Sequence, residues 1–130
     1  MKSKSLFLLM LIFSLFSCDR FHENNYDFPK RITFPAEGGT QYYLGGTVVS
    51  DFYISGKSSE WGGWGSGYKT GDPMVASYDW LTVKGEKFKD GLTITAAPNT
   101  SKSPRFLTIE IGTGATEYGY IKVRQNGKTE

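Results

Sequence analysis

The chain has little of the chemistry on which most active sites and metal centres depend. Of its 130 residues, one is cysteine and one is histidine. Cys18 and His22 both lie near the N-terminus, so the rest of the chain can form neither a Ser–His or Cys–His pair nor a nitrogen–sulfur metal site. The acids are scattered and lack calcium-loop spacing; Glu60 with Asp72 is the one carboxylate pair that suggests a glycosidase. We therefore predict no enzyme, no metal and no cofactor.

Long hydrophobic runs are also missing. The apolar stretch Leu6–Phe16 is interrupted only by Ser14, and as a helix it would be about 16 Å long, half of the ~30 Å hydrocarbon core. Lys2 and Lys4 precede it, and small residues follow. A secretory signal peptide typically has a positively charged N-terminal segment, then a short apolar segment, and a small residue before the cleavage site.

The end of this signal resembles the bacterial lipobox, through Leu15-Phe16-Ser17-Cys18. The resemblance implies that residues 1–17 are removed and that Cys18 carries a diacylglycerol as the new N-terminus. Two or three acyl chains are enough for stable anchoring. We predict a membrane-anchored lipoprotein, on the periplasmic or the surface-exposed leaflet of the outer membrane. The alternative is an ordinary signal peptide with an incidental cysteine.

The chain also lacks an excess of charge. The full sequence has 15 Lys and Arg against 13 Asp and Glu, and without Lys2 and Lys4 the two signs balance at 13 each. A neutral domain argues against nucleic acid or any other polyanion as the main partner.

Glycine and aromatic residues are plentiful, with 16 Gly and 15% Phe, Trp and Tyr. Residues 18–30 are polar without periodicity and predict a tether. From residue 31 to 127, short segments alternate apolar and polar residues, clearest in Leu92–Ala96, Leu107–Ile111 and Ile121–Val123, with turn residues between them. No window predicts a helix. The pattern predicts one all-β domain, an immunoglobulin-like antiparallel β-sandwich of about seven strands.

The second half of this domain resembles a known module. The residues that carry the resemblance are Trp80-Leu81-Thr82-Val83, Leu92-Thr93-Ile94, Ala97-Pro98-Asn99, Arg105 with Leu107-Thr108-Ile109, and Ile121 to Gly127. Together they are similar to the BACON domain, a Bacteroidetes-associated module often found N-terminal to carbohydrate-active enzymes. The resemblance implies an immunoglobulin-like sandwich and binding of carbohydrate or mucin.

The recurrent residues of this module also have structural explanations. Trp80 and Leu81 suit core packing at the start of a strand. Arg105 and Gln125 could satisfy carbonyls at a strand edge, and Asn99 suits a left-handed turn. We expect these roles rather than ligand contact.

Residues 56–71 form the segment that best fits a binding site. Trp61, Trp64 and Tyr68 lie among six glycines, and we expect a long loop here. Sugar rings stack on such aromatic faces. A regular strand would place the two tryptophans on opposite faces, so a shared platform requires a loop or a bulge. The alternative is that these rings fold down and cap the sandwich.

A second candidate surface is Tyr118 and Tyr120 beside Lys122 and Arg124, which we expect to be an ordinary solvated strand face. Two functions remain open. The first is a non-catalytic module that binds a glycan or mucin through Trp61, Trp64 and Tyr68. The second is a spacer or protein-interaction module that docks other envelope proteins.

Overall fold

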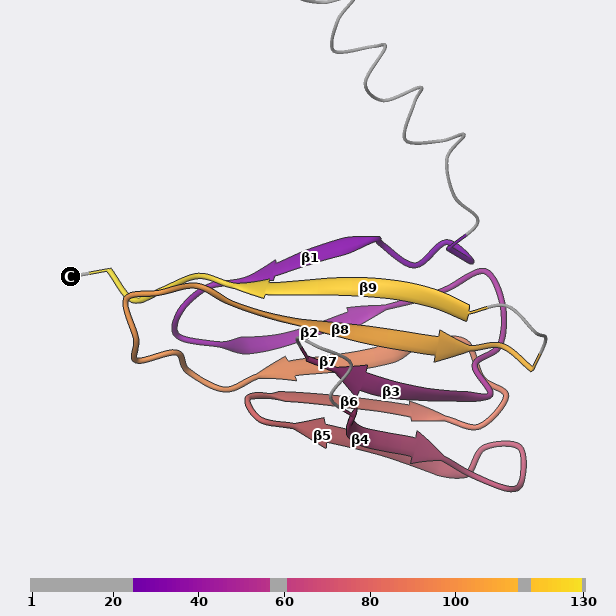
Figure 1. The fold of residues 1–130 in the computed structure, drawn as a ribbon. Coiled ribbons are helices and arrows are strands. Elements are labelled where there is room, and N and C mark those ends of the chain that lie inside the picture. The colour runs from indigo at the N-terminus through magenta and orange to yellow at the C-terminus, as the bar shows by residue number, and fades with distance from the viewer. Residues whose placement is uncertain (1–24, 57–60, 115–117, 130) are drawn as a thin grey trace, which may run out of the picture.

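Two β-sheets face each other in the computed structural model, which describes residues 25–56, 61–114 and 118–129 (Figure 1). The first sheet has the strand order β1 (Arg31–Phe34), β9 (Tyr118–Gln125), β8 (Arg105–Gly112), β3 (Asp51–Ser55) and β4 (Trp61–Ser66). The second has the order β2 (Gly39–Tyr43), β7 (Leu92–Ala96), β6 (Leu81–Glu86) and β5 (Pro73–Tyr78). The described residues contain no helix.

The core lies between the sheets because apolar residues occupy every second position of most strands. In β9 the pattern alternates strictly between exposed and buried. The first sheet contributes Phe52, Ile54, Ile109, Ile111 and Ile121, and the second contributes Met74, Leu81, Val83, Leu92 and Ile94, all with almost no exposed surface. The all-β sandwich predicted from this periodicity is confirmed.

The number of strands and one strand direction differ from the prediction. There are nine strands rather than about seven, and β1 pairs with β9 in parallel. One additional strand is β4, which lies in the segment expected to be a loop. Its glycines fit a crowded position: a Cβ at Gly65 would lie 2.5 Å from the Phe52 ring, and one at Gly63 would lie 2.3 Å from the carbonyl oxygen of Ser77 in β5. The glycines therefore allow β4 to pack closely, which sequence periodicity does not reveal.

Gly63 gives a direct test of this packing. Gly63→Ala is expected to lower the free energy of unfolding by about 1–3 kcal/mol, because the new methyl group meets backbone that cannot rotate away. Ser66→Ala, at an exposed position of the same strand, should change it by less than about 0.5 kcal/mol. Denaturant unfolding of both variants measures the difference, and equal midpoints would contradict the close approach of β4 and β5.

The described end of the expected tether is attached to the sandwich. The Asn25 amide donates to the carbonyl of Tyr120 at 2.7 Å, and the Tyr120 N–H donates back to Asn25 Oδ1 at 2.8 Å. Phe28 is buried in the core. These contacts bring the chain into the sandwich beside the first residues of β9 (Figure 1). Cys18 and the signal lie outside the described residues, among which no helix is long and apolar enough to cross a membrane.

The recurrent residues of the module have structural roles. Trp80 and Leu81 are buried, and the Arg105 guanidinium lies 4.8 Å from the centre of the Trp80 ring. Gln125 is fully buried and donates to backbone carbonyls, as expected. Asn99 donates to the carbonyls of Ser103 and Asn126. The expected left-handed conformation of Asn99 is wrong, because its φ is not among the positive values of the described residues.

Candidate functional site

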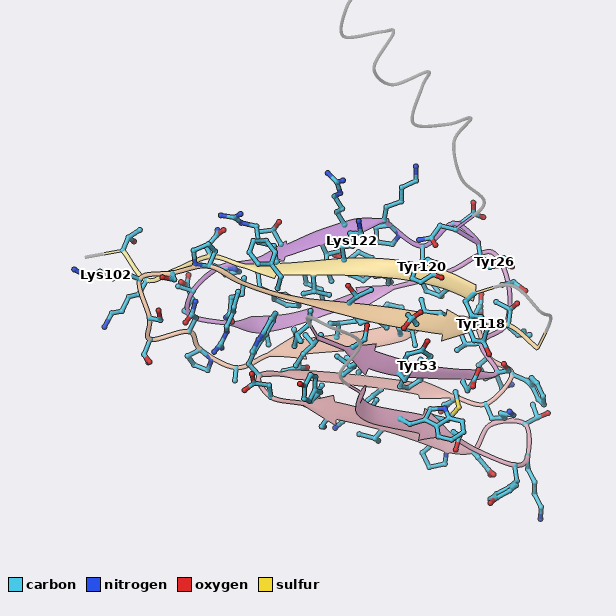
Figure 2. The ribbon with its side chains drawn as sticks, viewed as in Figure 1. Tyr26, Tyr53, Lys102, Tyr118, Tyr120 and Lys122 are labelled. Atoms are coloured by element: carbon cyan, nitrogen blue, oxygen red, sulfur yellow. The ribbon has the colours of Figure 1, made fainter. Side chains whose placement is uncertain are left out.

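Four aromatic side chains surround a hollow at one end of the first sheet. The hollow has a volume of about 600 Å³ and lies where β3 and β9 begin and β4 and β8 end. Its rings are Trp64, Tyr68, Phe88 and Tyr118, and its polar side chains are Ser50, Asp51, Ser66 and Lys87. We call this site the aromatic hollow. Figure 2 shows Tyr118 at this end of the sheet, with Tyr53 and Tyr120 nearby on the same sheet.

Strand register builds the floor of the aromatic hollow. Ser66, Asp51, Gly112 and Tyr118 stand side by side across β4, β3, β8 and β9. A Cβ at Gly112 would lie 2.0 Å from Asp51 Oδ1 and 3.1 Å from the Tyr118 ring. The missing side chain therefore lets the Asp51 carboxylate and the Tyr118 ring approach each other over β8. A carboxylate beside an aromatic ring is suited to a ligand with both hydroxyl groups and an apolar face.

Lys87 and Phe88 form one wall of the hollow from the turn after β6. The Lys87 ammonium donates to the Ser50 carbonyl at 2.8 Å and lies 4.6 Å from the centre of the Phe88 ring. The Phe88 N–H donates to the Val49 carbonyl at 2.8 Å, and the Val49 N–H donates to the Lys89 carbonyl at 3.0 Å, so this turn is held against the segment that precedes β3. Phe88 has a φ of 58°, a conformation that is costly for a bulky residue. The Phe88 ring is 40% exposed at the rim of the hollow.

Tyr68 stands on a tight turn that Asp72 holds together. The Asp72 carboxylate accepts hydrogen bonds from the N–H groups of Tyr68 at 3.0 Å and Lys69 at 2.8 Å. These two bonds hold the pKa of Asp72 below its ordinary value of 3.8. The ring itself is 97% exposed. The turn thus presents Tyr68 to solvent without packing its ring on the domain.

This turn should loosen only in acid. A lowered carboxyl pKa means that the bonds to Tyr68 and Lys69 contribute fully above pH 3.8 and are lost as the pH falls through the lower pKa of the folded state. Amide shifts of Tyr68 and Lys69, followed by NMR, should therefore move with a midpoint below 3.8. Asp72→Asn should abolish that transition, and a midpoint above 3.8 would contradict the two bonds.

The three aromatic residues predicted to bind a ligand, Trp61, Trp64 and Tyr68, differ in how the structure describes them. Trp64 is 59% exposed, so neither it nor Tyr68 caps the sandwich. The side chain of Trp61 lies outside the described residues, although its backbone pairs with Ser55. Between that pair and the pair of Trp64 with Tyr53, β4 has one more residue than β3. The bulge that a shared platform requires is therefore present in the backbone.

The second candidate surface adjoins the aromatic hollow. Trp64, Tyr53, Glu110 and Tyr120 form a row across β4, β3, β8 and β9. Burial, and then a side-chain hydrogen bond and the charge of Glu110, raise the pKa of the Tyr53 hydroxyl above its ordinary value. Tyr118 and Tyr120 are each about half exposed. The face of Tyr118 and Tyr120 is therefore exposed to solvent, as expected, and it is also rich in aromatic side chains.

Sequence reasoning missed the polar members of the hollow and Phe88. Lys87 and Phe88 lie in the highly charged segment Glu86–Asp90, whose sequence predicts only a turn. Asp51 was considered only as one of several scattered acids. Among the described residues, no group of three or more His, Cys, Asp or Glu could hold a metal ion. Glu60, the proposed partner of Asp72, lies outside the described residues.

Comparison with known proteins adds little. No family model and no curated protein matches the chain. A solved NMR structure of a protein from Bacteroides thetaiotaomicron is similar over 82% of this chain and 84% of its own, with 20% identity and a TM-score of 0.49. A Bacteroides ovatus GH5 xyloglucanase, solved with an XXXG heptasaccharide, is similar over 82% of this chain and 18% of its own, with 18% identity and a TM-score of 0.49. Likeness at this level carries no argument about function, and the resemblance to the BACON domain stays a prediction.

Proposed function

We propose that this protein is a non-catalytic glycan-binding module that uses the aromatic hollow as its site. The observation that carries the proposal is the convergence of four exposed rings with one carboxylate and one ammonium group in a single hollow. The C–H face of a pyranose can stack on Trp64 or Tyr118, while Asp51 and Lys87 are placed to bond its hydroxyl groups. Monomeric proteins seldom expose several large rings together unless the surface binds something.

Binding without catalysis fits the charged groups of the hollow. Asp51 is the one acid among its lining residues within the described chain, whereas glycoside hydrolysis normally needs two facing carboxylates. A single carboxylate can accept hydrogen bonds from sugar hydroxyls without any proton transfer. The resemblance of residues 31–127 to the BACON domain implies the same class of ligand, a carbohydrate or mucin glycan.

The proposal includes the location of the module. Lipidation of Cys18 would anchor the chain in the outer membrane, and the sandwich would follow after a short tether. A binding module tethered in this way would hold glycan close to the membrane rather than release it. Metabolic labelling with a palmitate analogue tests the anchor: the native chain should be labelled, and Cys18→Ala should not.

The function is tested by binding of the full chain, purified in detergent, to a panel of plant, host and mucin glycans. The native chain should bind at least one glycan, and a Trp64→Ala/Tyr118→Ala variant should lose that binding. Tyr42→Ala is the matched control, because Tyr42 is also exposed but lies on the second sheet. Absence of binding by the native chain would overturn the proposal and favour a protein partner in the envelope.

A further inference from the structure

A second hollow lies at the other end of the same sheet face and is lined by cations. It has a volume of about 370 Å³ and is formed by β1, β8 and β9. The outward-facing residues at its rim are Arg31, Thr33, Phe106, Thr108, Lys122 and Arg124. We call it the basic hollow. It contains three cations and no acid among the described residues that line it.

Two of these cations are placed directly opposite each other. In the parallel pairing of β1 with β9, Arg31 is the partner of Lys122, and Arg124 follows two residues along β9. Like charges in opposite positions of neighbouring strands are unfavourable. Neither the Arg31 nor the Lys122 side chain has a hydrogen bond or an ion pair with any residue in the described ranges. A bound anion would relieve the repulsion between Arg31 and Lys122, so the pair is suited to an anion-binding site.

The third cation is held in place. The Arg124 guanidinium lies 5.4 Å from the centre of the Phe106 ring, and its Nε donates to Asn126 Oδ1 at 3.2 Å. Neither contact is a hydrogen bond from the terminal amino groups, so these can donate to a carboxylate or sulfate group. Phe106 is itself half exposed. The basic hollow therefore combines an exposed ring with three cations, whereas the aromatic hollow combines its rings with one carboxylate and one ammonium group.

The two hollows are parts of one continuous surface. Strand β8 runs from Phe106 at the basic hollow to Gly112 at the aromatic hollow, about 20 Å for six steps along a strand. Between them lie Glu110 of β8 and its partner Tyr120 of β9, and Figure 2 shows Lys122, Tyr120 and Tyr118 in sequence along β9. An extended polymer could contact rings at both ends and the three cations of the basic hollow at one end.

We propose that the glycan is an acidic polysaccharide that lies along β8 and β9, with its carboxylate or sulfate groups in the basic hollow. This inference rests on the proposed function and adds the charge of the ligand and the direction in which it runs. The neutral net charge of the domain, which predicts no polyanionic partner, averages the three cations with acids that include Asp51 and Glu110 of the same sheet face. The basic hollow itself has no acid among its described lining residues. The specificity would come from three cations gathered at one end of one sheet face.

The test compares polymers that differ only in charge, using the full chain in detergent. The probes are polygalacturonate with its methyl-esterified form, and dextran sulfate with dextran. We expect the native chain to bind the charged member of at least one pair ten times more tightly or better, with affinity falling as salt is added. Arg31→Gln/Lys122→Gln/Arg124→Gln should remove this preference. Lys84→Gln/Lys89→Gln/Lys128→Gln, which removes the same charge from exposed positions elsewhere, should keep it.

The outcomes separate the two proposals. Equal binding of charged and neutral members, or a preference that survives the Arg31/Lys122/Arg124 variant, overturns the acidic ligand but leaves glycan binding intact. Absence of binding to these probes and to the glycan panel overturns both. If the three cations instead raise binding to phosphatidylglycerol vesicles over neutral vesicles and no charged polymer is preferred, the basic hollow faces lipid and the inference is wrong.

Discussion

Gln125→Leu is expected to lower the free energy of unfolding by about 3–5 kcal/mol. The amide nitrogen of this fully buried side chain donates to the carbonyls of Pro35, Ala36 and Ala97 at 3.1, 3.3 and 2.8 Å. Its oxygen accepts from Arg105 Nε at 2.7 Å. Leucine fills a similar volume but satisfies none of these groups, and unpaired buried polar groups are costly.

The contacts of Gln125 join three parts of the chain that are far apart in sequence. They tie the end of β9 to the segment after β1 and to the segment after β7. The matched control is Gln41→Leu, because Gln41 is only half-buried and its side chain makes two bonds: it donates to the Thr33 carbonyl and accepts from the Tyr43 hydroxyl. It should cost less than about 1.5 kcal/mol. Denaturant unfolding compares the two; similar losses would mean that the Gln125 bonds do not stabilise the sandwich.

The sequence was sufficient to predict the strands whose side chains alternate between apolar and polar. The alternation in Leu92–Ala96, Leu107–Ile111 and Ile121–Val123 identifies strands with one buried face. The sequence also predicts the structural roles of Trp80 and Gln125. It failed at β4, because glycines have no side chain to show a period. Whether a glycine-rich segment is a loop or a closely packed strand depends on its neighbours, here Phe52 and Ser77.

The site was predictable only in its exposed rings. Trp64 and Tyr68 stand out because they are aromatic residues among glycines. Phe88 and Tyr118 reach the same hollow from other strands and turns, and Asp51 joins them through the register of β3 with β8. Register and the conformation of the turn after β6 are long-range properties. No local pattern in the sequence places these residues together.

The rings of the aromatic hollow are not expected to contribute equally to binding. Trp64→Ala should weaken glycan binding about 10–100-fold, since truncating an aromatic residue that dominates an interface costs about 2 kcal/mol or more. Trp64 starts from a strand and keeps part of its surface covered. Tyr68 is almost wholly exposed on a turn, so its ring must be immobilised on binding, at a cost of about 0.5–1.5 kcal/mol. Tyr68→Ala should therefore weaken binding less than threefold.

This ranking separates a preformed site from one that forms around its ligand. Titration calorimetry of Trp64→Ala, Tyr68→Ala and the control Tyr42→Ala, with whichever glycan the native chain binds, gives the three affinities. A large loss for Trp64 alone means that the strand register holds the Trp64 ring in its binding position before the glycan arrives. A larger loss for Tyr68 than for Trp64 would contradict the ranking, because the exposed ring would then have to close onto the sugar and make the dominant contact. In that case Asp72→Asn, which frees the same turn, should weaken binding as well, through the turn rather than through any contact with the glycan.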